Sequence, residues 1–70
     1  MTSEQSHSYK VIEIVGTSTV GVDDAIRNGI ADAGAGEGDL DWFEVREIRG
    51  RLDRDRVHWY QVRMGVGFRV

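Results

Sequence analysis

The chain has 70 residues, a formal net charge of −3 and no cysteine. A chain this short buries only about 60% of the surface that its unfolded form exposes, so extra burial through oligomerisation is favoured. The lack of cysteine excludes disulfides and thiolate zinc sites. A mildly acidic chain lacks the positive field that general nucleic-acid binding needs, although five arginines between Arg46 and Arg56 leave local anion binding open.

No apolar stretch approaches the roughly 20 residues that a membrane span requires, so no membrane partner is expected. Residues 1–8 are polar and lack the apolar segment of a secretion signal. We therefore expect a disordered tail over residues 1–8, a single domain over residues 9–70 and a cytoplasmic location.

The first predicted strand covers residues 9–15, which are rich in β-branched and aromatic side chains. Thr17, Ser18 and Thr19 follow as candidate N-cap residues of a helix. The backbone amides of Gly16, Thr17 and Ser18 could instead hold an anion, but a plain helix cap is the favoured interpretation.

A helix is predicted next because apolar residues recur at helical spacing on one face: Val22, Ala25, Ile26, Ile30 and Ala33. Gly29 lies on or near this apolar stripe, where it permits close packing of the helix on a sheet. Three glycines in the segment 34–38 predict that the helix ends there or has a loose last turn, with a surface loop.

The second predicted strand covers residues 42–52, and both of its faces are mixed in character. Strict alternation places Trp42, Glu44, Arg46 and Ile48 on one face and Phe43, Val45, Glu47 and Arg49 on the other. Such a strand is typical of a sheet that uses one face for its core and the other for an interface or ligand.

A charged hairpin loop is predicted at residues 53–56, followed by a long third strand at residues 57–70. The apolar face of this strand alternates without a break: Tyr60, Val62, Met64, Val66, Phe68 and Val70. If the turn is centred near Arg54, Trp42 faces position 66 or 67 and Gln61 faces position 47 or 48.

The predicted fold class is α+β: a β-α-β-β order with a three-stranded antiparallel sheet and one helix packed on it. One helix cannot cover both faces of so long a sheet. The opposite face carries Trp42 or Trp59, Gln61 and several arginines, and we expect partner subunits to cover it.

No catalytic set is found, so the chain is not expected to be an enzyme. It lacks cysteine and offers no Ser-His-acid order. The glycines of residues 34–38 follow a helix and have the wrong spacing for a dinucleotide loop. The carboxylates of Asp39, Asp41, Glu44 and Glu47 indicate a solvated acidic segment, with a weak Ca²⁺ or Mg²⁺ contact as the minor alternative, and no metal site is predicted.

Trp42 stands where a polar loop gives way to a strand, and it admits two interpretations. From composition alone, a core or interface tryptophan is favoured, because large aromatic side chains dominate burial. The alternative is a stacking platform for a flat aromatic ligand, since indole is electron-rich and presents a broad face.

Several segments at matching separations resemble the dodecins over about residues 9–70: Tyr9–Ser18, Asp41–Val45, Arg49-Gly50, Tyr60–Val62 and Val66–Arg69. The resemblance implies a hollow homododecamer with helices outside and sheets inside. It implies non-enzymatic flavin binding, storage and photoprotective quenching, with FMN favoured over riboflavin or FAD. Coenzyme A near the three-fold axes is a minor expectation.

The same resemblance assigns site residues. Stacked flavins lie between tryptophans of two subunits, which corresponds to Trp42, and a glutamine binds the polar edge of the ring, which corresponds to Gln61. Asp41 lines the pocket, and the ribityl-phosphate region is expected near Arg49, Arg51, Glu47 and Arg69.

The alternative is a dodecin-like shell that holds an ion or coenzyme A and does not use flavin. The resemblance includes calcium-binding members that lack the tryptophan, and Trp42 and Gln61 argue against that use here. The glycine-rich segment 34–38 departs from the alanine-rich helix end that is usual in the family.

Overall fold

The computed structural model describes residues 8–70 and has the element order β1 (Tyr9–Ser18), α1 (Val22–Glu37), β2 (Trp42–Asp53) and β3 (Arg56–Arg69). All pairings are antiparallel and the strand order is β1-β3-β2, so β3 is the central strand. The predicted β-α-β-β fold class is confirmed. Of the expected disordered tail, residues 1–7 lie outside the described residues.

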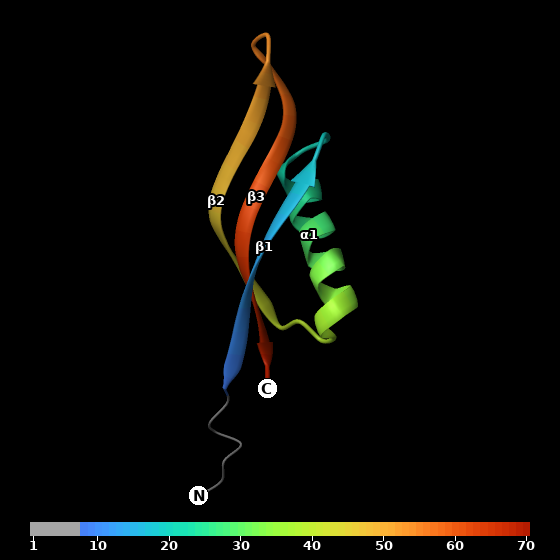
Figure 1. Ribbon diagram of the computed structural model, residues 1–70, viewed down its shortest axis with the longest axis vertical. Coiled ribbons are helices and arrows are strands. Elements are labelled where there is room, and N and C mark those ends of the chain that lie inside the picture. Colours follow the sequence, from blue (N-terminus) through green and yellow to red (C-terminus); the bar gives the residue numbers. More distant parts are fainter. Residues whose placement is uncertain (1–7) are drawn as a thin grey trace, which may run out of the picture.

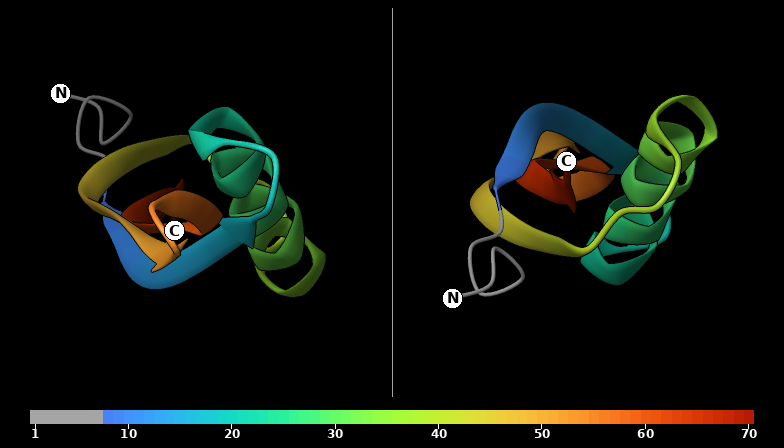
Figure 2. Two further views of the ribbon diagram at one scale, coloured as in Figure 1. Left: turned by 90° about the horizontal axis from the view of Figure 1, so that it is seen from above. Right: turned by 90° about the horizontal axis from the view of Figure 1, so that it is seen from below.

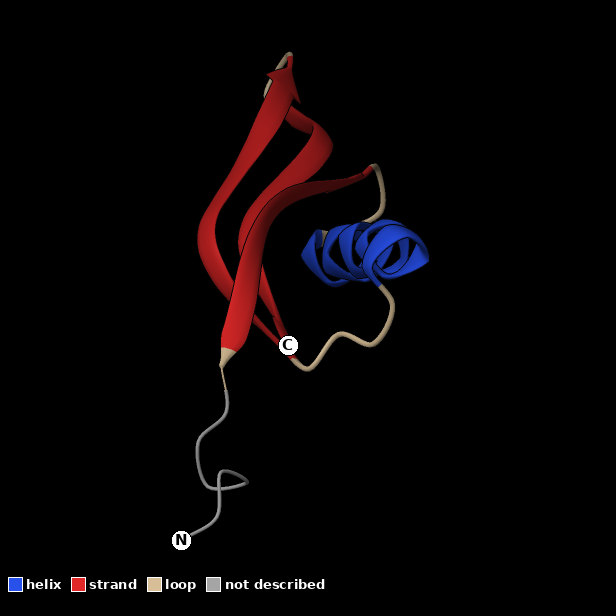
Figure 3. Cartoon of the chain, turned by 60° about the horizontal axis from the view of Figure 1, so that its bottom comes forward, coloured by secondary structure: helices blue, strands red, loops and turns tan. Residues whose placement is uncertain are grey.

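The sheet is twisted, and its β2–β3 hairpin projects well past the end of β1 (Figure 1). Seen from either end, α1 lies on one side of the sheet (Figure 2). Figure 3 shows the same arrangement, in which one sheet face has no helix beside it. The described part of the chain therefore has two layers, a sheet and one helix.

The core lies between α1 and the sheet. Val62, Met64 and Val66 of β3 are fully buried, as is Ala25 of α1. Partly buried apolar side chains from both layers pack around them: Ile12, Ile14, Val22, Ile26, Ile30, Leu40 and Tyr60. The predicted apolar face of the helix is confirmed, and that of the third strand is confirmed from Tyr60 to Val66. Val70, predicted on the same face, lies beyond β3 and is 76% exposed.

Two glycines allow α1 to approach the sheet closely. A Cβ atom on Gly16 would lie 2.1 Å from the carbonyl oxygen of Ala25, and one on Gly29 would lie 2.7 Å from Cε of Met64. Gly16 and Gly29 face each other across this contact. The role predicted for Gly29 is confirmed, whereas the role of Gly16 was missed.

The helix start differs from the prediction, because β1 continues to Ser18 and the N-cap residue is Gly21, without a side-chain cap. The N-cap assignments to Thr17, Ser18 and Thr19 are therefore wrong. The Ser18 hydroxyl oxygen accepts hydrogen bonds from the backbone amides of Val20 (2.8 Å) and Gly21 (3.4 Å), and it donates to Asp24 (2.7 Å). Ser18 thus holds the turn that leads into the helix.

The helix end also differs from one expectation. The helix runs through Gly34 and Gly36 and ends at Glu37, so these residues are not a surface loop. Gly38 follows with φ at 88°, and its amide donates to the carbonyl oxygen of Gly34 at 3.1 Å. A positive φ favours glycine, which explains why the helix stops at the last of the three glycines.

Candidate functional site

The sheet face opposite α1, which we call the open face, carries most of the polar and aromatic side chains of the strands. Its β1 and β3 positions are the odd-numbered residues, because the even-numbered ones pack against α1. From β2 it takes the residues that pair with those β3 positions: Trp42, Glu44, Glu47, Arg49 and Arg51.

A β-bulge at Arg46 decides which β2 side chains reach the open face. Val45 pairs with Met64 and Glu47 pairs with Arg63, so Arg46 is an extra residue in the ladder. The predicted faces are therefore wrong from Glu47 onward, because strict alternation would turn Glu47 and Arg49 toward the helix and Ile48 away from it. The bulge shifts the alternation by one residue and collects the polar residues on one face.

Trp42 lies flat on the open face. It pairs with Gly67, as the turn position predicted, and a Cβ on Gly67 would lie 2.3 Å from Cε2 of the indole. Tyr9 of β1 meets the indole edge-on, with ring centroids 6.1 Å apart and planes inclined by 61°. One face of the indole thus covers Gly67, and the side chain retains 39% exposure for a stacked ring on its outer face.

Asp41 and Arg69 accompany Trp42 at this end of the sheet. The Asp41 amide donates to the carbonyl oxygen of Gly67 at 2.8 Å, which fixes the entry into β2. Both residues line a concavity together with Asp39 and Leu40. The structure therefore brings together three of the predicted site residues, Asp41, Trp42 and Arg69.

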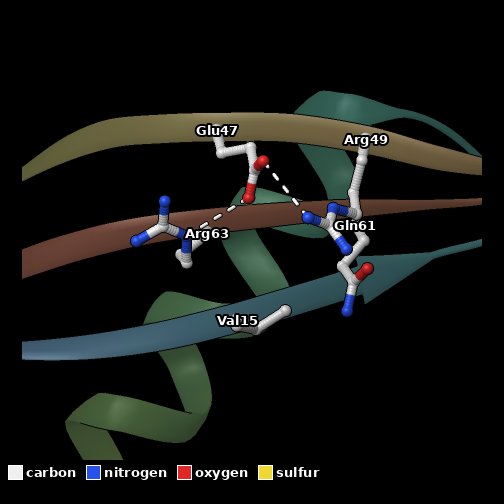
Figure 4. Close-up of a pocket in the computed structure, with 5 residues that line it drawn as sticks. All are labelled: Val15, Glu47, Arg49, Gln61 and Arg63. Carbon is white, nitrogen blue, oxygen red and sulfur yellow. Dashed lines mark hydrogen bonds and ion pairs between the residues drawn. The ribbon is translucent and has the colours of Figure 1, made fainter.

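A second group of predicted site residues surrounds Gln61 in the middle of the open face. Gln61 pairs with Arg49, not with position 47 or 48, because His58 forms a second bulge nearer the turn. Val15, Glu47, Arg49, Gln61 and Arg63 line a concavity of about 180 Å³ (Figure 4). The next pair toward the turn is Arg51 with Trp59.

Glu47 is held between two arginines in this concavity (Figure 4). Arg49 Nη2 donates to one carboxylate oxygen at 3.2 Å, and Arg63 Nε donates to the other at 3.3 Å. Arg63 also donates to Glu13 of β1 at 2.6 Å, so the chain of ion pairs crosses all three strands. These ion pairs fix the orientation of the guanidinium groups of Arg49 and Arg63.

These contacts shift the pKa values of the carboxyl groups. The pKa of Glu47 is lowered mainly by its hydrogen bond from Arg49 and then by that from Arg63. The pKa of Glu13 is lowered mainly by the hydrogen bond from Arg63, whose own pKa is raised by the two carboxylates. Both carboxylates are therefore ionised at neutral pH, and Arg63 stays charged.

The two groups of site residues do not meet within one chain. Gly67, which lies beneath Trp42, and Gln61 are six residues apart on β3, which is roughly 20 Å along an extended strand. A single chain therefore offers an aromatic platform at one place and a hydrogen-bonding, cationic concavity at another.

Several residues on this face were not among the predicted site residues. The Arg46 guanidinium covers Gly65, where a Cβ would lie 2.5 Å from Nη2, and it forms an ion pair with Glu44 at 3.8 Å. Tyr9, Glu13 and Arg63 also join the face. The alternation of odd and even residues in β1 is the signal that could have found Tyr9 and Glu13. Alternation along β2 placed Arg46 on the face of Trp42, but it did not predict the bulge there.

The acidic residues do not gather around a common point. Across residues 8–70, no group of three His, Cys, Asp or Glu side chains could hold a metal ion. Glu44 and Glu47 lie instead against arginines. In the same part of the chain, no helix has the length and apolar character to cross a bilayer.

The fold and this face define a class of protein: a small α+β subunit whose single helix covers one sheet face and leaves an aromatic and cationic face for ligands or partner subunits. The dodecin family profile matches residues 8–70. The chain therefore belongs to the dodecin family.

Individual relatives agree with this assignment. A dodecin from Thermus thermophilus is 48% identical over 62 residues, which cover 89% of this chain and 90% of that protein. The solved dodecin from Streptomyces davaonensis is 54% identical with a TM-score of 0.87, over 93% of this chain and 96% of the other. A calcium dodecin from Mycobacterium tuberculosis, described as having a calcium-binding site, is 27% identical with a TM-score of 0.78, over 90% of each chain.

Proposed function

We propose that this protein forms a homododecamer that binds flavin, with FMN as the favoured form, and stores it while quenching its excited state. The observation that carries the proposal is the indole of Trp42, which lies flat over Gly67 with its outer face open. A flavin ring stacked there gains about 1 kcal/mol beyond the burial of area. Storage and quenching of this kind need no acid–base catalyst.

Assembly supplies the parts of the site that one chain lacks. Because Gly67 and Gln61 lie roughly 20 Å apart, the three-ring flavin system cannot reach Trp42 and Gln61 of the same chain. A neighbouring chain brings its Gln61 to the polar edge of the ring. Symmetry likewise supplies a second Trp42, so that one tryptophan per chain makes a two-sided clamp.

The charged side chains give the proposed site its preference for a phosphorylated flavin. Arg49, Arg51 and Arg69 are the candidate ligands of the ribityl-phosphate group, with Glu47 orienting Arg49 through their 3.2 Å ion pair. Asp41 lines the pocket beside Trp42. A shell that holds an ion or coenzyme A without flavin remains the alternative, and the exposed indole of Trp42 argues against it.

A fluorescence titration of the ligand-free protein with FMN tests this proposal. We expect strong quenching of flavin emission by the wild-type protein, partial quenching by Trp42→Phe, and loss of quenching in Trp42→Ala. Size-exclusion mass is recorded for each variant, so that a loss of assembly is separated from a loss of stacking. No quenching at micromolar wild-type protein would contradict flavin binding, and a monomeric or dimeric mass would contradict the assembly.

A further inference from the structure

Arg63 stands at the centre of the open face, and none of the proposed flavin contacts involves it. It pairs with Val15 of β1 on one side and with Glu47 of β2 on the other. It lines the same concavity as Gln61, and its side chain is partly exposed (Figure 4). Arg63 therefore borders the polar part of the proposed site without being one of its assigned ligands.

The guanidinium of Arg63 is shared between two carboxylates from the two outer strands. Its Nη1 donates to Glu13 of β1 at 2.6 Å, and its Nε donates to Glu47 of β2 at 3.3 Å. The shorter bond ties the guanidinium to β1, a strand that carries no assigned flavin ligand. Glu13 thus anchors Arg63, and Arg63 in turn holds one oxygen of Glu47.

This hold on Glu47 determines how much of Arg49 is left for a ligand. Glu47 gives Oε1 to Arg63 and Oε2 to Arg49, whose Nη2 donates to it at 3.2 Å (Figure 4). A guanidinium carries several N–H donors in a planar fork, so Arg49 keeps donors for an anion. A carboxylate with both oxygens free instead binds an arginine through two parallel hydrogen bonds and occupies the fork. Arg63 prevents this by holding Oε1.

The charges of this group balance only while Arg63 is present. Ion pairs join two carboxylates and two arginines into one group: Glu13, Glu47, Arg49 and Arg63. Removal of Arg63 would leave one positive and two negative charges there. The remaining excess of negative charge would repel an anion that approaches Arg49.

We infer that Arg63 is a positioning residue for the phosphate group of the ligand, because it holds Glu47 away from part of the Arg49 fork. The inference rests on the proposed function, since it takes Arg49 as a ligand of the ribityl phosphate. Arg63 acts through Glu47 and does not itself contact the phosphate. It therefore sets the selectivity for a phosphorylated flavin over the same flavin without phosphate.

Titration of the assembled protein with FMN and with riboflavin measures this selectivity, because the two flavins differ only in the phosphate. In Arg63→Gln we expect FMN affinity to fall about tenfold and riboflavin affinity to stay within about twofold of the wild type. Arg56→Gln is the matched control: it removes the same charge from an exposed position at the start of the same strand, and both affinities should be unchanged. Unchanged FMN affinity in Arg63→Gln, equal losses of both flavins, or an equal FMN loss in the control would each overturn the inference.

A double variant tests whether Arg63 acts through Glu47. Arg63→Gln combined with Glu47→Gln removes the competing carboxylate together with its restraint, so FMN affinity should recover to within about threefold of the wild type. No recovery would show that Arg63 contacts the phosphate directly, which contradicts a positioning role. Size-exclusion mass confirms that each variant keeps the wild-type assembly.

Inorganic phosphate repeats the comparison without the flavin ring. Broadening of its phosphorus NMR signal reports binding, and we expect less broadening with Arg63→Gln than with the wild type or Arg56→Gln. Equal broadening by all three proteins would overturn the inference, whatever the flavin titrations give. A wild-type protein that binds neither flavin but keeps this difference would contradict the flavin proposal and support the role of Arg63.

Discussion

The two faces of the central strand β3 differ in what organises them. Toward α1, the side chains of Val62, Met64 and Val66 are fully buried. On the open face, Gly65 and Gly67 provide space that an arginine and a tryptophan from β2 fill. One face is organised by the burial of its own side chains, and the other by the absence of side chains at two positions.

The largest difference between the faces should appear in stability. Met64→Ala removes a fully buried side chain and is expected to cost about 3 kcal/mol. Its neighbour Arg63, on the open face, has a side chain that is 43% exposed, and Arg63→Ala is expected to cost far less, because solvent screens exposed ion pairs. Urea unfolding at a fixed subunit concentration measures both changes, and equal losses would contradict the comparison.

The contact between helix and sheet should be the next most sensitive point. Gly16→Ala would place a Cβ 2.1 Å from the carbonyl oxygen of Ala25, and because the obstacle is backbone, we expect a loss of about 2 kcal/mol. Gly21→Ala is the control: nothing lies within 4 Å of its added Cβ, and its φ of 174° is open to any residue. Thermal unfolding of the two variants side by side checks this prediction.

On the open face, the predicted effect falls on binding instead of stability. Gly67→Ala would push the Trp42 indole off the sheet, and we expect it to weaken FMN binding about tenfold. Gly65→Ala displaces only the flexible end of Arg46, so its FMN affinity should stay within about twofold of the wild type. Comparable losses in both variants would show that the position of the indole is not what matters.

The smallest effect concerns acid. The pKa values of Glu13 and Glu47 are lowered from 4.5 in the folded chain, so their ion pairs stabilise the fold above that pH. This contribution is lost as the pH falls through the lowered folded values. We therefore expect the thermal midpoint of Glu47→Gln to lie slightly below that of the wild type at neutral pH, and the gap to close in acid. A gap that widens in acid would reverse the sign of the argument.

The face of β3 that packs against α1 was predictable from sequence, because the apolar character of each residue there indicates that the residue is buried. The alternation from Tyr60 to Val66 predicts a face that the structure confirms, and the turn near Arg54 predicts the pairing of Trp42 with Gly67. The local glycine pattern also predicts the helix end at Gly38, but not the path of the helix through Gly34 and Gly36. Packing of the helix face outweighs the modest cost of glycine there.

The open face was predicted less well, because the alternation of apolar and polar residues along a strand does not show where a β-bulge lies. Strict alternation turned Glu47 and Arg49 toward the helix, whereas pairing with β3 places them beside Arg63 and Gln61. The role of Arg46 likewise depends on the space above Gly65, which lies on another strand. Such features follow from strand register and not from the order of residues in one strand.

The two bulges also govern how the hairpin can change in length. Arg46 is an extra residue on β2 and His58 an extra residue on β3, so the two offsets cancel before the turn at Arg54 and Asp55. Loss of either bulge residue would leave every other side chain of its strand on its present face. An insertion or deletion at any other point within these strands would exchange apolar and polar faces from there onward. Natural variation in the length of this hairpin is therefore expected to concentrate at Arg46, at His58 and at the turn.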